Sequence, residues 1–89
     1  MKRLNLGAGR VQPEGWVNVD LYGVMFGCRQ FDITNALDVE LLADAHGAFD
    51  EIVANHLLSC FSHWELLDPV LPNILRLLKP GAVFRAIFP

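Results

Sequence analysis

Short apolar runs alternate with stretches of helical character along this chain, and that alternation restricts its fold more than any other feature. Strands are predicted at residues 3–6, 16–20, 49–54 and 82–88, with a further short strand ending at residues 31–32. Helical stretches separate the later strands, and such an order is typical of strands that run parallel. The sequence therefore predicts an α/β domain with a parallel sheet.

The first predicted helix lies between the third and fourth strands. Thr34 or Asn35 is a suitable N-cap, and Gly47 is a suitable stop. The spacing of four apolar residues places them on one helix face. These residues are Leu37, Leu41, Leu42 and Ala45.

A second helical region precedes the last strand. It opens with Ser62 and Glu65 at the spacing of a capping box. Asp68 and Pro69 then fit the cap and first position of a new helix, because proline is tolerated in the first turn. We expect this helix to end before the turn at residues 79–81.

Composition excludes several classes of protein. Apolar residues make up 53% of 89 residues and the formal net charge is only -3, which is unlike a disordered chain. No Lys/Arg cluster exists to displace counterions from phosphates, so binding to nucleic acid by charge is not expected. No apolar run approaches the ~20 residues needed to span a bilayer, and we expect no membrane association.

The same features suggest a single domain, residues 1–89, in the cytoplasm. No apolar run of signal-peptide length follows the basic start of the chain. Cys28 and Cys60 are then expected to be free thiols, as in a reducing compartment.

A glycine turn and an acidic residue indicate a ligand site. Gly7, Ala8 and Gly9 follow the first strand, where glycine allows a tight turn and the close approach of a ligand. Asp20 ends the second strand, at the edge of a parallel sheet where α/β folds bind ligands. A carboxylate there can accept both hydroxyl protons of a ribose. A simple turn beside a strand end is the alternative interpretation.

The type of nucleoside follows from what the turn lacks. Gln12 stands where a dinucleotide fingerprint would have its third glycine, and Asp20 lies too close to the turn. Residues 9–16 leave little room for a helix whose N-terminus would bind a pyrophosphate. NAD is therefore the weaker candidate. S-adenosylmethionine, an adenosine without phosphates, fits better.

Several segments resemble class I S-adenosylmethionine-dependent methyltransferases. Residues 4–9 (Leu-Asn-Leu-Gly-Ala-Gly) and 15–21 (Gly-Trp-Val-Asn-Val-Asp-Leu) are similar to the branch with an L-N-L-G-C-G…G-W-x-N-x-D pattern. Residues 31–33, 49–57 and 77–81 resemble later motifs of the same family, in the same order. The resemblance implies a Rossmann-like parallel sheet with flanking helices. It also implies methyl transfer from S-adenosylmethionine to an acceptor that the sequence does not identify.

The resemblance also implies roles for residues near the first two strands. Gly7, Ala8 and Gly9 would place their backbone against the methionine and ribose parts of the cofactor. Asn5 occupies the position of an acidic residue in the wider family and belongs to the same cofactor site. Asp20 would hold the ribose hydroxyls.

Further roles fall on residues after the second, third and fourth strands. Leu21 would pack on the adenine, Asp32 would accept from its amino group, and the Ile33 backbone would lie beside it. Asn55 would border the point of methyl transfer. His56, next to it, is the candidate catalytic base, although a structural histidine is an equally good interpretation.

Two departures from the family pattern leave a second function open. The loop after the fourth strand reads His-Leu-Leu-Ser-Cys, where the branch often has H-x-L-E-H. The chain also stops at Pro89, before the antiparallel hairpin that follows the fifth strand in the family. We therefore expect a domain truncated after that strand. A non-catalytic remnant, which binds S-adenosylmethionine or only keeps the fold, is the alternative.

The truncation also suggests a partner. If the fifth strand is an edge, its apolar side chains Phe84, Ile87 and Phe88 are poorly covered, which favours a homo-oligomer formed through this strand. His56, Cys60 and His63 have a spacing that one helix could direct at a metal. No fourth ligand is evident, and no metal site is predicted.

Overall fold

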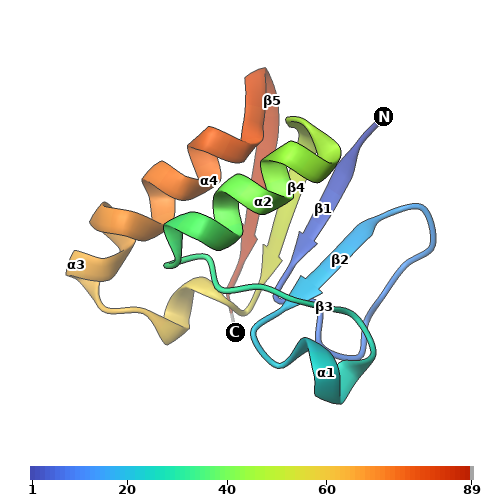
Figure 1. Ribbon diagram of the computed structural model, residues 1–89. Coiled ribbons are helices and arrows are strands. Elements are labelled where there is room, and N and C mark those ends of the chain that lie inside the picture. Colours follow the sequence, from blue (N-terminus) through green and yellow to red (C-terminus); the bar gives the residue numbers. More distant parts are fainter. Residues whose placement is uncertain (89) are drawn as a thin grey trace.

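The structure, a computed structural model, describes residues 1–88 and contains one parallel five-stranded sheet (Figure 1). The strand order is β3-β2-β1-β4-β5, and every neighbouring pair is parallel. This confirms the predicted α/β, Rossmann-like class. The strands are β1 Arg3–Leu6, β2 Val17–Asp20, β3 Arg29–Gln30, β4 Phe49–Asn55 and β5 Leu78–Ile87.

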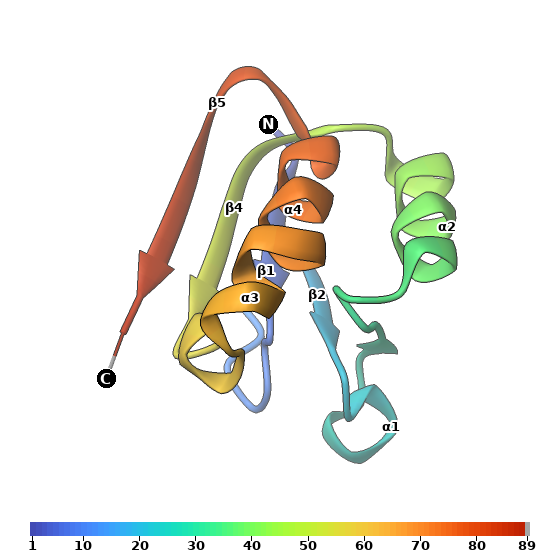
Figure 2. The same ribbon diagram turned by 90° about the vertical axis from the view of Figure 1, so that its left-hand side faces the viewer.

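The longer helices lie on one face of this sheet. Figures 1 and 2 place α2 and α4 side by side there, with α3 leading into α4. The short α1 lies apart from them, between β2 and β3. The helical elements are α1 Gly23–Phe26, α2 Ala36–His46, the 3₁₀ turn η1 Leu58–Cys60, α3 His63–Glu65, the π-helical turn η2 Leu66–Val70 and α4 Leu71–Leu77.

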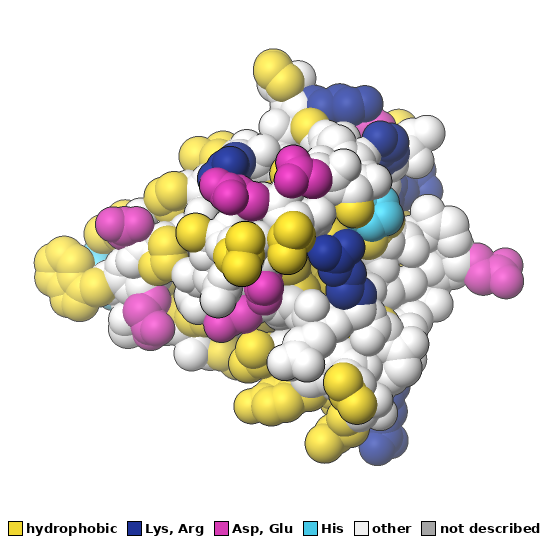
Figure 3. Space-filling model, viewed as in Figure 1, with side chains coloured by type: hydrophobic (Ala, Val, Ile, Leu, Met, Phe, Trp, Pro, Cys, Tyr) yellow, Lys and Arg dark blue, Asp and Glu magenta, His cyan; other side chains and the backbone are white. Residues whose placement is uncertain are grey.

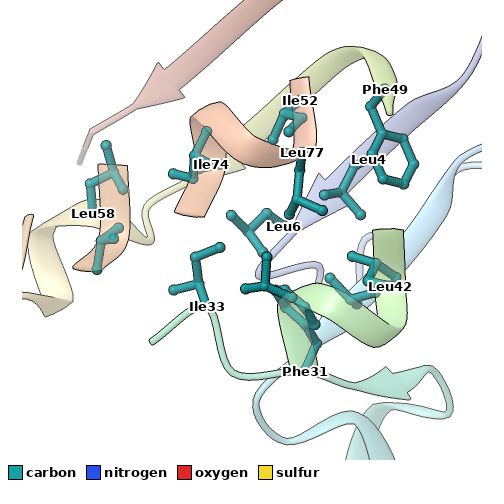
Figure 4. Packing of buried hydrophobic residues seen from close by; sticks show 14 residues of the cluster. Leu4, Leu6, Phe31, Ile33, Leu42, Phe49, Ile52, Leu58, Ile74 and Leu77 are labelled. Carbon is teal, nitrogen blue, oxygen red and sulfur yellow. The ribbon is translucent and has the colours of Figure 1, made fainter. Parts of the chain in front are cut away.

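A single hydrophobic core fills the space between the helices and the sheet (Figure 4). Parallel register sets Leu4 beside Ile52, and Leu6 beside both Val19 and Ala54, so these strands direct apolar side chains to the same face. The helices complete the core with Val39 and Leu42 from α2 and with Ile74 and Leu77 from α4. Further core residues are Phe31, Ile33, Phe49, Leu58 and Val70.

The capping signals of α2 and α3 in the sequence are confirmed. The Asn35 side chain accepts a hydrogen bond from the Asp38 N–H, and α2 ends at Gly47, which has φ 73°. Ser62 and Glu65 form the complete capping box of α3. Asp68 has extended, non-helical backbone angles and separates the two helical pieces, but α4 begins at Leu71 with Val70 as its N-cap, two residues after the predicted start at Pro69.

The predicted buried face of α2 is wrong in part. Leu37, Leu41 and Ala45 are exposed, whereas Val39 and Leu42 are fully buried. The physical reason is that α2 has apolar residues on more than one side, so its sequence defines no single stripe. Packing against α4 and the sheet selects Val39 and Leu42. In Figure 3 apolar side chains lie among mixed acidic and basic ones on this helical side of the molecule.

β5 begins earlier than predicted and forms an edge of the sheet. It pairs with β4 from Leu78, and the register shifts between Phe49 and Glu51. Pro80 and Gly81 therefore lie within β5, next to this irregularity, rather than before the strand. Ile87 and Phe88 are exposed as expected, but Phe84 packs partly against the core.

Within residues 1–88, the segment that lies over the opposite face of the sheet is the connection between β1 and β2. Residues 7–16 form turns and no helix, as their length predicts. Parallel sheets usually have both faces covered, so this open face is unusual. Among residues 1–88, no helix is both long enough and apolar enough to cross a lipid bilayer.

Candidate functional site

A cavity of about 440 Å³ lies at the carboxyl ends of β1, β2, β3 and β4. The strand order reverses between β1 and β4, and open α/β sheets bind ligands at such a switch point. Predicted site residues account for much of its wall: Gly7, Gly9, Asp20, Leu21, Asp32, Ile33, Asn55 and His56. The fold therefore brings together predicted site residues that are up to 49 positions apart, from Gly7 to His56.

The glycine turn uses its own N–H groups inside the protein. Gly7 and Ala8 both donate to the Val19 carbonyl, at 3.0 and 2.9 Å. The Gly9 N–H donates to Oδ2 of Asp20 at 2.9 Å. An anion such as a pyrophosphate would need free N–H groups at this position. The N–H groups of Gly7, Ala8 and Gly9 are therefore not available to a phosphate.

Positive φ angles explain the glycines of this turn. Gly7 has φ 74°, and a Cβ there would lie 3.3 Å from Cδ1 of Leu57. Gly9 has φ 54°, with open space around the position of its missing Cβ. Glycine adopts these angles without the penalty that other residues incur. The turn and the Leu57 side chain can consequently pack closely together in the wall of the cavity.

Asp20 fixes the turn and still has acceptor capacity. Its Oδ2 accepts from Gly9 N–H and its Oδ1 accepts from Tyr22 N–H, at 2.9 and 2.8 Å. A carboxylate has about four lone-pair sites, so each oxygen can accept one more hydrogen bond. Asp20 thus serves the turn, as the simpler interpretation required, and also remains able to hold a diol.

Asp32 uses its two oxygens unequally. Oδ1 accepts from both the N–H and the hydroxyl of Thr34, at 2.9 and 2.6 Å. Within residues 1–88, no hydrogen bond ends on Oδ2 of Asp32, and none starts from the N–H of Ile33. Asn73 from α4 holds this segment by donating to the Ile33 carbonyl at 2.7 Å. Two consecutive residues of the cavity wall thus each leave one polar group without a partner in residues 1–88, an acceptor on Asp32 and a donor on Ile33.

His56 stands where β4 ends, in a backbone conformation that is rare for its residue type. Its φ is 55°, in the left-handed region, while its N–H donates to the Ile87 carbonyl at 2.6 Å. Such a conformation costs about 1–2 kcal/mol for a residue with a Cβ. Asn55 and His56 are both exposed and both line the cavity. The turn therefore directs a titratable side chain to the switch point.

The charges around this cavity favour a cation over an anion. Asp20 and Asp32 contribute carboxylates, and no Lys or Arg is among the lining residues that the structure describes. Burial raises the pKa of the nearby Cys28 thiol, and the Asp20 charge raises it further. A cavity lined by charge of one sign attracts a ligand of the opposite sign.

Asn5 and Ala8 are the two predicted site residues that do not line this cavity. Both line a second cavity on the open face of the sheet. The Asn5 side chain donates to the Val11 carbonyl at 2.7 Å and to Oδ1 of Asn18 at 3.1 Å, and so secures the loop between β1 and β2. Asn5 thus holds this loop in place on the open face of the sheet.

Other lining residues were not expected from the sequence. They are Leu6, Tyr22, Phe26, Phe31, Leu57, Cys60 and Phe61. Leu6 ends β1, and Tyr22, Phe31 and Leu57 follow strand ends closely, so proximity to a strand end was the available signal for these four. The other three lie on or next to the short α1 and η1 segments. Within the described part of the chain, no three His, Cys, Asp or Glu side chains are grouped to hold a metal ion.

Comparisons with known proteins identify no relative. No protein-family model, no curated protein and no solved structure matches this chain.

Proposed function

We propose that this chain binds S-adenosylmethionine in the cavity at the carboxyl ends of β1–β4 and acts as a methyltransferase on a separate acceptor. One observation carries the proposal. A single cavity joins the glycine turn, the carboxylate of Asp20, the free acceptor and donor at Asp32 and Ile33, and the exposed His56. The resemblance of the sequence to class I methyltransferases assigns each of them a role in that site.

The cofactor's chemical groups match the polar groups of the cavity. Asp20 would hold the ribose diol, and Leu21 would lie against the adenine ring. Oδ2 of Asp32 and the N–H of Ile33 offer the acceptor and donor that the amino edge of adenine requires. The two carboxylates also favour a ligand that carries a positive sulfonium.

In this function the protein mainly orients the reactants and excludes water. Bound S-adenosylmethionine supplies an activated methyl group for an in-line displacement. Leu57 and Phe61 line the apolar wall, and Asn55 lines the cavity beside His56. Holding two reactants in line accelerates a bimolecular step strongly. A ring nitrogen of His56 would take the proton if the acceptor nucleophile must lose one.

A non-catalytic binding protein is the second candidate, and one observation favours it. The His56 side chain forms no hydrogen bond with residues 1–88 that would fix its tautomer or orientation. Catalytic bases usually have such an orienting partner. Retention of the cofactor without methyl transfer to any acceptor would support this second function.

Calorimetry with S-adenosylmethionine, S-adenosylhomocysteine and NAD tests cofactor binding. We expect the first two to bind and NAD not to bind. Asp20→Ala should abolish binding, whereas Asp44→Ala, on the exposed side of α2, should leave it unchanged. Equal binding of NAD, or equal binding by the Asp20→Ala protein, would refute the proposal. Turnover assays with candidate acceptors then separate enzyme from binding protein.

We further propose a cytoplasmic location and a homodimer. Cys28 and Cys60 are free thiols, which accords with a reducing compartment. β5 is an edge strand; Val83 and Ile87 on it are 51% and 46% exposed, and Phe88 just after it is 58% exposed. A second copy that pairs along this edge would satisfy its backbone and cover these side chains.

A further inference from the structure

A second cavity, of about 530 Å³, lies on the open face of the sheet. Its floor is formed by side chains that point away from the helices, among them Arg3 of β1, Glu51 and Val53 of β4, and Arg85 of β5. Trp16 forms part of its wall, just before β2. The function proposed above uses none of these side chains.

One carboxylate holds two guanidinium groups in this cavity. Nε of Arg3 lies 3.4 Å from Oε1 of Glu51, and Nε of Arg85 lies 3.1 Å from Oε2. The Glu51 side chain is only 12% exposed, whereas the two arginine side chains are 43% and 66% exposed. The partly buried carboxylate is therefore the fixed point, and the guanidinium groups are accessible from the cavity.

The outer nitrogens of both arginines remain available. Each ion pair uses Nε, and the Nη groups of Arg3 and Arg85 donate no hydrogen bond to residues 1–88. Paired N–H donors of guanidinium match the two oxygens of a carboxylate or phosphate. With two arginines against one glutamate, the group carries a net positive charge that an anion would balance.

An apolar surface adjoins these charges. The guanidinium carbon of Arg3 lies 5.5 Å from the centre of the Trp16 ring, which fixes both groups. Val53 and Ile87 supply aliphatic side chains to the same cavity. A ligand that combines an anionic group with a flat or apolar body would match both parts of the wall.

The two cavities meet at the switch point. Gly7, Asn55 and His56 line both of them. A molecule in the second cavity would therefore approach the cofactor cavity at the candidate base.

We propose that the second cavity binds a small organic anion, a carboxylate or phosphate on an apolar body, and that this anion is the methyl acceptor. The binding part of this inference stands on the Arg3–Glu51–Arg85 group and Trp16. Its acceptor part rests on the function proposed above.

Tryptophan fluorescence tests the binding part. Trp64 is 77% exposed on α3, so Trp64→Phe leaves Trp16 as the reporter. Benzoate and phenyl phosphate serve as probes at constant ionic strength, with uncharged benzamide as the matched control. We expect a saturable change in Trp16 emission with one or both anions and none with benzamide. The anion that binds more tightly distinguishes carboxylate from phosphate recognition.

Arginine variants in the Trp64→Phe background locate the site. Arg85→Gln should weaken anion binding by about tenfold or more, because hydrogen bonds between charged groups are lost. The anion affinity of Arg85→Lys should lie between those of the Arg85 protein and Arg85→Gln, because lysine keeps the charge without the planar pair of donors. Arg76→Gln, on the exposed side of α4, is the control and should change affinity less than about twofold. Circular dichroism checks that each variant is folded.

Two results would overturn the inference: equal responses to benzoate and benzamide, or unchanged benzoate affinity in both Arg85 variants. Calorimetry with S-adenosylhomocysteine keeps the two proposals separate. Binding of S-adenosylhomocysteine without anion binding refutes this inference alone. Anion binding without S-adenosylhomocysteine binding refutes the methyltransferase function and, with it, the acceptor role.

Discussion

At the scale of single residues, the two oxygens of Asp32 allow a sharp test of adenine recognition. Asp32→Asn keeps an acceptor for both hydrogen bonds from Thr34 but replaces the free oxygen with an amino group. That amino group would oppose the amino group of adenine. We expect S-adenosylhomocysteine to bind the variant at least about tenfold more weakly by calorimetry.

A purine analogue supplies the control for this substitution. S-inosylhomocysteine presents an oxygen in place of the adenine amino group, so the wild-type preference for the adenosine form should shrink in Asp32→Asn. A general loss of structure would lower the affinity for both compounds equally. An unchanged preference would show that Asp32 does not recognise the base.

The lowered pKa of Asp50 leads to a prediction of how the free energy of unfolding depends on pH. The Lys2 N–H donates to its Oδ2 at 2.7 Å and Nζ of Lys79 donates to its Oδ1 at 3.1 Å. These contacts, the first above all, lower the pKa of the Asp50 carboxyl below its ordinary 3.8. Because the folded state has the lower pKa, the contribution to stability is complete above the unfolded pKa. It is lost as pH falls through the folded value.

Asp50→Asn should therefore unfold at lower urea concentration than wild type at neutral pH. The gap between the two proteins should narrow as pH falls below about 4, where the wild-type carboxylate becomes protonated. Urea titrations at several pH values measure this gap. A gap that stays constant down to the most acidic pH would contradict the assignment.

At the scale of elements, the cap of α2 should matter for the whole core. The Asn35 side chain accepts from Asp38 N–H at 3.1 Å, and α2 carries the buried Val39 and Leu42. Asn35→Ala should lower the free energy of unfolding by about 1 kcal/mol in urea titrations. Asn35→Asp, which keeps a capping oxygen, is the control and should lose much less. Equal losses would mean that the cap does not stabilise α2.

Most elements could be predicted because their signals are local. Turn glycines, caps and short apolar runs act within a few residues, and they located β1, β2, β4, α2 and the start of α3. The buried face of α2 could not be predicted, because packing against α4 determines that Val39 is buried and Leu41 is exposed. Short α1 and η1 have too few residues to produce a periodic pattern.

The candidate site also has a part that the sequence predicts and a part that it does not. Gly7, Gly9 and Asp20 were predictable because each stands at a strand end, where α/β folds place their ligands. The second cavity depends on which face of the sheet stays uncovered. Alternation in β1, where Arg3 and Asn5 flank the buried Leu4, was the available signal, since it is typical of a sheet with one exposed face.

At the scale of the whole molecule, the free edge of β5 predicts a dimer. Light scattering after gel filtration, at low micromolar protein, should give twice the chain mass of 9.9 kDa. Val83→Lys on β5 combined with Phe88→Lys just after it should yield monomers, because lysine along an edge strand opposes pairing. Leu75→Lys, at an exposed apolar position of α4, should remain dimeric. A monomeric wild type would refute the dimer.

Residues that line both cavities can couple the affinities of the two proposed ligands. Because Gly7, Asn55 and His56 face both, a molecule that settles on one side alters the environment of the other. Thermodynamics then requires reciprocity: the factor by which a nucleoside changes the affinity for an anion equals the factor by which that anion changes the affinity for the nucleoside. If the proposed nucleoside and anion both bind, the three shared residues, at the point where the strand order reverses, are where such coupling would arise.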